Sequence, residues 1–258
     1  MRCHSPMPLA GMILLAVAAL AACLAVPVPA QSAQPVSPAR ACAVARPPNS
    51  LWSLARCCAA DLSSDPYCRA YSKTDQFIIL KDNSPAKPDG YLIIPTTRVT
   101  GIEDRQIFAP PVADFWAHGS QQAQLWLKQP AADTALAINS EYERSQDQLH
   151  IHISCVRHDV AAALAANDAK IGGDPAKPIA LALGPENHLY RVIKVTSLTA
   201  ASPFDLAAAM SGAKTDMAEQ SIAVVGSRAP GVYYVLGTSH HGANPGAAEE
   251  LLDQACRS

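Results

Sequence analysis

The sequence has little charge and lacks a basic cluster. Only 16% of its 258 residues are charged, the formal net charge is −2, and no run of Lys or Arg occurs in a composition that is 49% hydrophobic. A nucleic-acid-binding domain usually carries a basic patch, so we expect no nucleic-acid partner. No glycine-rich P-loop is present either. The apolar composition excludes disorder for the whole chain and predicts a folded domain with a substantial core.

Residues 1–30 have the pattern of an export or membrane segment. A short basic start with Arg2 precedes an uncharged apolar stretch from Leu9 to Val26. Three outcomes stay open: an uncleaved anchor, cleavage after Ala30, and lipidation at Cys23, which ends a lipobox-like Leu-Ala-Ala-Cys. Because the positive charge precedes the apolar stretch, the rest of the chain is expected outside the cytoplasm. We therefore expect a single N-terminal anchor in a bacterial inner membrane with the folded part on the periplasmic side, or alternatively a lipoprotein or a secreted form.

Export changes the interpretation of the cysteines. Six follow the N-terminal segment: Cys42, Cys57, Cys58, Cys68, Cys155 and Cys256. An even number in an oxidising compartment favours disulfides, whereas a zinc site would need a repeated C-x-x-C spacing that is missing here. Local spacing favours one bridge between the Cys57/Cys58 pair and Cys68, and a long one between Cys155 and Cys256. Spacing alone leaves other pairings open.

Periodicity predicts an α+β fold with an antiparallel sheet and helices. Residues 31–48, rich in Pro, Ala and Ser, are interpreted as a tether, and residues 49–258 as the folded domain. Strands are expected at 76–82, 91–99, 134–140, 148–156, 179–183, 189–197, 221–227 and 231–238, and helices at 51–60, 112–128, 160–168, 203–218 and 246–255. Asp159 is the expected N-cap of the helix at 160–168. Because the order strand–strand–helix–strand–strand repeats, we expect two similar halves, about 49–160 and 161–258.

The expected strand "QLHIHISCV" carries an unusual set of polar residues. Alternation directs Leu149, Ile151, Ile153 and Cys155 into the core and places His150, His152 and Ser154 together on the other face. One interpretation is an ordinary amphipathic strand whose outer face happens to be polar. The other is a functional site, which we favour because two imidazoles and a hydroxyl in consecutive positions are uncommon on a plain surface.

Three chemistries use such an arrangement. Metal binding needs a third ligand, and no other histidine supplies a matching motif. A paired-histidine phosphoesterase needs a second His-x-Ser, and the only other one, His118-Gly-Ser120, falls in an expected helix. The third chemistry is attack by an imidazole on phosphorus, with neighbouring groups that fix the tautomer and hold the phosphate oxygens.

The segment "INSEYERSQDQLHIHIS" resembles the signature of the histidine triad superfamily of nucleotide hydrolases and transferases. In that signature an amide side chain lies seven residues before a Gln, which lies four before the first histidine; Asn139, Gln146 and His150 keep both spacings. With "FIILKD", "GYLIIPTTRVTGIE", "HIHISC", the membrane segment and the late cysteine, residues 50–257 resemble the CDP-diacylglycerol pyrophosphatase family. The resemblance implies a histidine triad-like fold.

The resemblance also implies an activity and a set of roles. The activity is hydrolysis of CDP-diacylglycerol to CMP and phosphatidate. His152 would attack the phosphorus on the CMP side to form a nucleotidyl-histidine, and His150 would orient it. Ser154 stands where many members have a third catalytic histidine. Asn139 and Gln146 would bind phosphate oxygens through their amides.

The partners follow from the same resemblance. Lys81 and Arg98 would hold the charge of the diphosphate, although an ion-paired strand face is an equal alternative for them. No metal and no cofactor is expected, and the lipid-linked substrate would be met at the membrane surface. Two other functions stay open: a metal-dependent or paired-histidine phosphoesterase acting on another nucleotide diphosphate, and a non-enzymatic lipoprotein that binds nucleotide or lipid.

Overall fold

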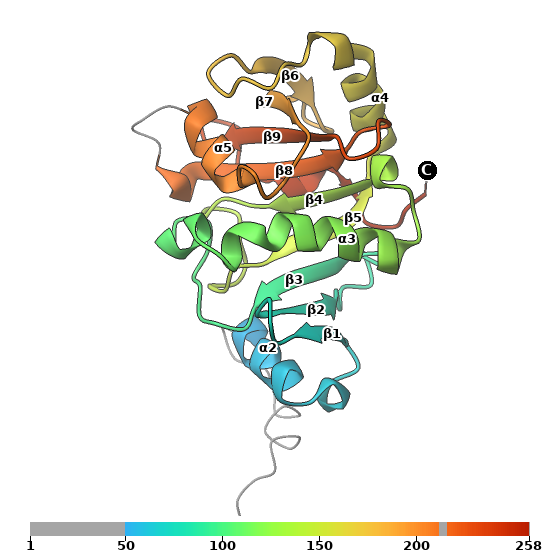
Figure 1. The fold of residues 1–258 in the computed structure, drawn as a ribbon, viewed down its shortest axis with the longest axis vertical. Coiled ribbons are helices and arrows are strands. Elements are labelled where there is room, and N and C mark those ends of the chain that lie inside the picture. The colour runs from blue at the N-terminus through green and yellow to red at the C-terminus, as the bar shows by residue number, and fades with distance from the viewer. Residues whose placement is uncertain (1–49, 212–215, 258) are drawn as a thin grey trace, which may run out of the picture. The chain divides into compact units, whose positions relative to one another are not determined.

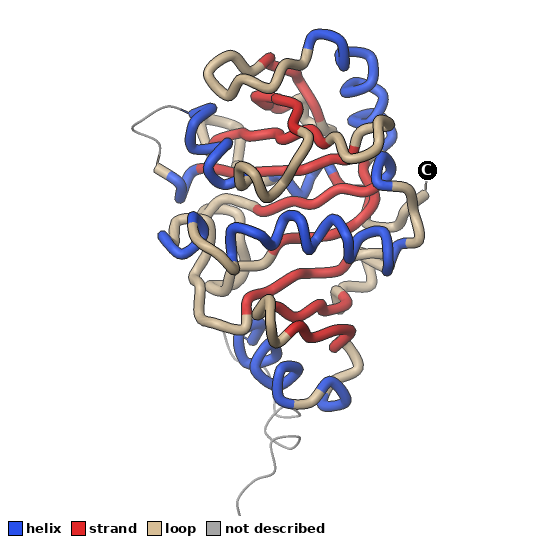
Figure 2. The backbone as a smooth tube through the Cα atoms, in the orientation of Figure 1, coloured by secondary structure: helices blue, strands red, loops and turns tan. Residues whose placement is uncertain are grey.

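A continuous antiparallel sheet runs through the part of the chain that the computed structural model describes, residues 50–211 and 216–257. Its strands are β1 (Cys68–Ser72), β2 (Phe77–Lys81), β3 (Tyr91–Pro95), β4 (Thr134–Ile138), β5 (Ile151–Val156), β6 (Ile179–Leu183), β7 (His188–Val195), β8 (Gln220–Gly226), β9 (Tyr233–Ser239) and β10 (Leu252–Asp253). The strands, drawn in red in Figure 2, have the order β1-β2-β3-β5-β4-β8-β9-β7-β6. Strand β10 pairs with β5. The predicted α+β class with an antiparallel sheet and helices is confirmed.

The strand order repeats within the sheet. β2-β3-β5-β4 and β6-β7-β9-β8 have the same internal arrangement, and the two groups meet where β4 pairs with β8, with Ala137 opposite Ala223. In each group the helix precedes the third strand: α3 (Phe115–Leu127) comes before β4 and α5 (Pro203–Ser211) before β8, and both lie on one face of the sheet (Figure 1). The expected boundary between the halves near residue 160 stays a prediction.

Both faces of the central strands are covered. On one face Phe115, Trp116 and Phe204 pack against the sheet around Ile153 and Val224. Gly119 lets α3 lie close to β4, because a Cβ there would come within 2.9 Å of Leu136 Cδ2. On the other face, residues of α4 (His158–Asn167) and of the 3₁₀ helix η7 (Ala248–Leu251) contribute to a second apolar cluster. The strand bearing the histidines is therefore enclosed by protein on both sides.

The remaining elements are short. Helix α2 (Ser50–Ala60) packs at the β1 side of the sheet, and 3₁₀ turns connect the longer elements. These turns are η1 (Leu62–Ser64), η2 (Arg105–Phe108), η3 (Val112–Asp114), η4 (Ala131–Asp133), η5 (Asp168–Lys170) and η6 (Met217–Glu219). None of the helices in the described ranges is long and apolar enough to cross a membrane. The predicted segment 1–30, with Cys23, and the tether 31–48 lie outside the described residues.

Two predicted helices differ from the structure. Instead of a helix, residues 246–255 contain η7 and β10, where Leu252 pairs with Val156 and Asp253 with Cys155. Strand pairing with β5 outweighs the helix propensity of this segment. In addition, Gly246, at φ +73°, cannot belong to a right-handed helix. The predicted helix 203–218 is also wrong at its C-terminal end, because Asp216 lies outside any helix and residues 217–219 form the 3₁₀ helix η6; α5 is described as far as Ser211.

Three smaller differences concern the start of α4, the end of β3 and one strand that was not predicted. Asp159 is not the N-cap of α4; that position belongs to Arg157, whose guanidinium donates to the Asp159 carboxylate. Strand β3 ends at Pro95 rather than near residue 99. Strand β1 was not predicted, although it pairs with β2 along its whole length.

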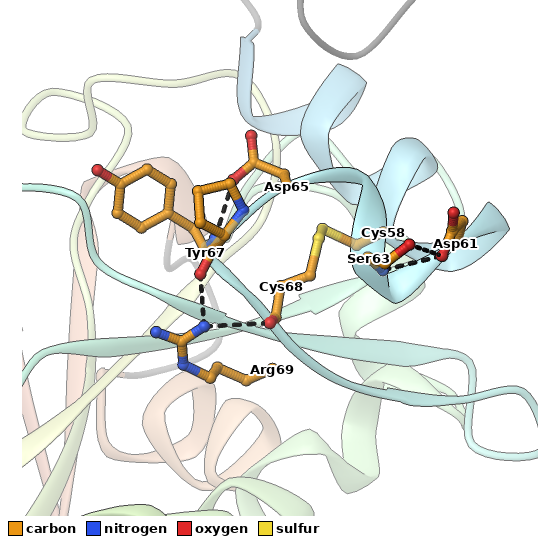
Figure 3. The surroundings of a disulfide bond; sticks show 8 residues. Cys58, Asp61, Ser63, Asp65, Tyr67, Cys68 and Arg69 are labelled. Atoms are coloured by element: carbon orange, nitrogen blue, oxygen red, sulfur yellow. Dashed lines mark hydrogen bonds between the residues drawn. A yellow bond between two sulfur atoms is a disulfide. The ribbon is translucent and has the colours of Figure 1, made fainter. Parts of the chain in front are cut away.

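The two predicted disulfides are confirmed. Cys58 bonds to Cys68, with a Cα–Cα distance of 5.6 Å, and Cys155 bonds to Cys256, with a Cα–Cα distance of 5.2 Å. The first ties α2 to the start of β1 (Figure 3). The second ties the C-terminal segment to β5, directly beside the histidine positions.

Candidate active site

A pocket with one apolar and one polar side opens next to the histidines. Its volume is about 220 Å³. The apolar side consists of Leu51, Leu54, Leu80 and Leu92, with Tyr67, and the polar side of Lys81, Asp82, Asn83, Lys87, Ser145, Gln146, His150 and His152. Such a pocket suits a ligand that has both an apolar part and an anionic part.

Helix α2 contributes Leu51 and Leu54 to the apolar side, and its position is fixed from two sides. Ala55 and Cys58 pack on Ile78, in the cluster beneath the helix, while the Cys58–Cys68 disulfide closes the turn that follows the helix (Figure 3). At the other end of α2, the backbone N–H of Leu51 donates to Gln146 Oε1 over 3.4 Å. Gln146 therefore links the helix to the histidine segment.

The two histidines lie at the polar end of the pocket. His152 sits on β5 opposite Leu92 of β3 and Ala137 of β4, while His150 comes one residue before the strand begins. Their ring centroids are 4.9 Å apart with an interplanar angle of 73°. His150 Nδ1 lies 2.7 Å from the carbonyl oxygen of Gln148, which can only accept, so Nδ1 carries the proton.

Burial lowers the pKa of both imidazoles. His150 is only 9% exposed and His152 only 7%. Loss of hydration disfavours the charged form and is the main cause in each case; for His152 the nearby His150 and Lys87 lower the pKa further, to well below its usual value. Both rings are therefore neutral at neutral pH, and a neutral imidazole has the lone pair that a nucleophile needs.

A carboxylate from the C-terminal segment reaches His152. Glu249 Oε2 lies 3.3 Å from His152 Nε2 and accepts from Asn139 Nδ2 over 3.4 Å. Glu249 Oε1 accepts from Lys87 Nζ and, over 2.9 Å, from Gln254 Nε2. The Glu249 backbone N–H donates to Asn139 Oδ1 over 3.0 Å, which holds the residue in place. Asn139 and His152 are thus joined through an anionic group.

The hydroxyl of Ser154 is occupied by the backbone. Ser154 is fully buried, and its Oγ donates to the Asp253 carbonyl over 2.8 Å, with the Asp89 carbonyl at 3.2 Å. It connects β5 with β10 and with the loop between β2 and β3. Ser154 faces the same side of β5 as His152, as predicted, but its hydroxyl lies among main-chain acceptors.

A family-level comparison adds to this geometry. The model of the family described as CDP-diacylglycerol pyrophosphatase matches residues 46–258. The chain therefore belongs to the CDP-diacylglycerol pyrophosphatase family. A CDP-diacylglycerol pyrophosphatase of Yersinia pestis is 35% identical over 190 residues, which cover 70% of this chain and 72% of that protein.

Two solved structures are similar at a lower level. A DUF4931 family protein from Bacillus cereus has a TM-score of 0.46 and 11% identity, covering 69% of this chain and 88% of that one. A yeast Ap4A phosphorylase has a TM-score of 0.44 and 12% identity, covering 72% of this chain and 64% of that one. Similarity at this level adds nothing about activity.

In this member of the CDP-diacylglycerol pyrophosphatase family, most predicted site residues come together. His150, His152, Gln146 and Lys81 line one pocket, and Asn139 contacts the carboxylate beside His152. Arg98 is not among the lining residues. It is exposed, with its guanidinium carbon 5.9 Å from the centroid of the Trp52 ring.

The prediction missed Lys87, Glu249 and Gln254. Lys87 lies in the turn "NSPAKPDG", whose only local signal is a turn, and the other two lie in a segment predicted to be helical. Lys87 and Glu249 are 162 residues apart in sequence. Within the described residues, no group of three or more His, Cys, Asp and Glu side chains is placed to hold a metal ion.

Proposed function

We propose that this protein hydrolyses the pyrophosphate bond of CDP-diacylglycerol to give CMP and phosphatidate, with His152 as the nucleophile. Membership of the family supports the reaction, since the relative from Yersinia pestis is named for it. One observation carries the assignment of the nucleophile: a buried, neutral imidazole faces a carboxylate that is held by Asn139, one of the predicted phosphate ligands.

The proposed reaction has two steps. A ring nitrogen of His152 attacks the phosphorus on the CMP side, the bond to the bridging oxygen breaks, and its electron pair leaves with phosphatidate. Water then attacks the same phosphorus and gives up a proton to the solvent, the phosphorus–nitrogen bond breaks with its electron pair returning to the ring nitrogen, and CMP leaves with the water oxygen. The amides of Asn139 and Gln146 would donate to the phosphoryl oxygens as charge develops.

The environment of Ser154 fits this leaving group. Phosphatidate leaves as a phosphate monoester, whose second pKa is about 6. Such a group departs as an anion near neutral pH without a strong acid beside it. We therefore propose that Ser154 acts by holding β10 and the β2–β3 loop through its backbone contacts, rather than by protonating the leaving group.

The substrate is a membrane lipid, which makes the N-terminal segment part of the proposal. We propose that residues 1–30 attach the protein to the bacterial inner membrane with the domain on the periplasmic side. Two of the apolar lining residues, Leu51 and Leu54, belong to α2, the first described element after the N-terminal region. A tethered domain would meet the scissile bond at the membrane surface.

The direct test is a hydrolysis assay of the full-length protein in detergent, with CDP-diacylglycerol, with and without EDTA. We expect CMP and phosphatidate in equal amounts and the same rate in EDTA, because a histidine nucleophile needs no metal. Inactivation by EDTA that zinc reverses would indicate the metal-dependent phosphoesterase instead. Absence of any turnover would favour a binding lipoprotein.

The lowered pKa of His152 predicts the pH dependence of this reaction. The nucleophile is the neutral ring, which is populated above its pKa, so a pKa below the usual value moves the acid limb to lower pH. We expect kcat/KM to stay level down to a pH of about 6.5, the ordinary pKa of histidine, and to fall only below it. A profile that already falls by half near neutral pH would contradict the buried, neutral state of His152.

A further inference from the structure

We propose, building on the function proposed above, that Lys87 binds the diphosphate of the substrate and that Glu249 occupies this binding position in the substrate-free protein. The predicted diphosphate ligands were Lys81 and Arg98. Arg98 lies outside the pocket lining and the Lys81 ammonium donates to backbone carbonyls, whereas Lys87 lines the pocket and pairs with carboxylates that an anionic ligand can replace.

The ammonium group of Lys81 is used by the backbone. Lys81 Nζ donates to the carbonyl oxygens of Gly90 (2.9 Å) and Lys87 (3.0 Å), and the Asp82 carbonyl lies at 3.4 Å. An ammonium has three protons, so these acceptors account for its donors. Lys81 therefore folds the β2–β3 loop over the pocket and places Lys87, while Arg98 lies outside the pocket lining.

Lys87 has partners of a different kind. Its ammonium contacts two carboxylates, those of Glu249 and, at 3.8 Å, Asp82. Its side chain is 27% exposed and lines the pocket together with His152. A partly solvated ion pair contributes little net stability, so a phosphate can replace one of the carboxylates at small cost.

Glu249 lies where an anionic ligand would be bound. Three side-chain donors, Lys87, Asn139 and Gln254, bind its carboxylate, and His152 Nε2 lies 3.3 Å from Oε2. Two carboxylate oxygens with one shared negative charge resemble two non-bridging oxygens of a phosphoryl group. Asn139 and His152 belong to the predicted phosphate site, so the carboxylate occupies part of the position that the substrate needs.

Competition between two anions makes the effect measurable. A phosphoryl group and the Glu249 carboxylate would repel each other at one set of donors, so the carboxylate must leave for the ligand to bind. The apparent dissociation constant then equals the intrinsic constant divided by the fraction of molecules in which the donors are free. Removing the carboxylate charge should tighten anion binding, and removing Lys87 should weaken it.

The chain offers two matched controls. Glu250 follows Glu249 in the same turn, but its carboxylate accepts from Tyr190 (2.7 Å) and contacts His188 (2.9 Å) away from the pocket. Lys177 is a surface lysine whose side chain is 84% exposed and whose ammonium lies 3.9 Å from Asp174. Neither Glu250→Gln nor Lys177→Ala should change anion affinity by more than about twofold, the usual range for a substitution away from a site.

The experiment is calorimetric binding of inorganic pyrophosphate to the full-length protein in detergent. We expect Lys87→Ala to raise the dissociation constant about 10- to 100-fold, as for loss of a charged hydrogen-bond partner, and Glu249→Gln to lower it several-fold. Lys87→Met, which keeps the aliphatic stem, should behave like Lys87→Ala. Melting temperatures, measured in parallel, identify any variant that fails to fold.

Unchanged affinity in folded Lys87→Met, or weaker binding in Glu249→Gln, would overturn this assignment. The proposed function is tested separately by hydrolysis of CDP-diacylglycerol. If the wild-type protein hydrolyses the lipid but Lys87→Met leaves the pyrophosphate affinity unchanged, only the assignment of the diphosphate site is contradicted. If pyrophosphate binding depends on Lys87 but CDP-diacylglycerol is not hydrolysed, only the proposed reaction is contradicted.

Discussion

Replacement of His152 by alanine is expected to lower kcat/KM for CDP-diacylglycerol by at least ~10³-fold, the scale seen when a nucleophile is removed from a concerted site. In the proposed mechanism the imidazole supplies the bond-making nitrogen in the first step; the other histidine of the pocket lining is His150, whose ring centroid lies 4.9 Å away. His152 pairs across β5 with Leu92 and Ala137, so truncation removes the ring without removing backbone pairing. The rate is measured as CMP release under conditions where the substrate concentration is below KM.

His158→Ala is the matched control for this variant. His158 is an exposed histidine at the start of α4, outside the pocket lining. Its loss should change the rate by about twofold at most. Wild-type activity in His152→Ala would contradict the role of His152 as nucleophile. If His150→Ala then lost ~10³-fold in rate, the nucleophile would be His150.

Removal of the Cys155–Cys256 disulfide is expected to cost about 4 to 5 kcal/mol of unfolding free energy, because it closes a long loop. The two cysteines are 101 residues apart, and the bond holds the end of the chain beside β5. Cys256→Ser breaks the bridge and leaves Cys155 as a small buried side chain. The free energy is measured by denaturant unfolding of the variant and the wild type.

The shorter disulfide provides the comparison. Cys58 and Cys68 are only 10 residues apart, so Cys68→Ser should cost less, about 3 kcal/mol or below. The rate of hydrolysis should also differ between the two variants, because the segment before Cys256 carries Glu249 and Gln254. A loss below about 1 kcal/mol in Cys256→Ser would show that β10 pairing alone holds this segment.

Residue alternation predicted the histidine strand well but not its surroundings. The pattern placed His152 and Ser154 on one face of β5, with Ile151 and Ile153 on the other, and the structure agrees. It suggested an outward polar face, whereas the structure buries that face. The cover comes from the C-terminal segment and the β2–β3 loop, whose contacts with β5 leave no trace in a local pattern.

The missed residues have the same physical explanation. The contacts of Glu249 with Lys87 and Asn139 span 162 and 110 residues. Lys87 lies in a segment whose local sequence indicates only a turn, and Glu249 in a segment predicted to be a helix. Spacing along one segment, as from Asn139 to Gln146 and His150, indicates a shared site, but it cannot reveal a carboxylate that arrives from the end of the chain.

The C-terminal helix was predicted because residues 246–255 have high helix propensity. Propensity differences are small, and pairing with β5 together with a covalent bond outweighs them. For Ser154 the position on the strand was predicted correctly, but that position did not indicate the role of the side chain. Its two carbonyl contacts depend on β10 and on Asp89, which only the folded chain brings together.

We propose that His152 forms a covalent bond to the CMP phosphorus. The most direct test is to mix the wild-type protein with CDP-diacylglycerol, stop the reaction with alkaline denaturant, and analyse the peptides that contain residues 146–157 by mass spectrometry. We expect a cytidylyl adduct on His152 that appears before steady state and is absent in His152→Ala. CMP release without an adduct at early times, or an adduct on His150 alone, would contradict it.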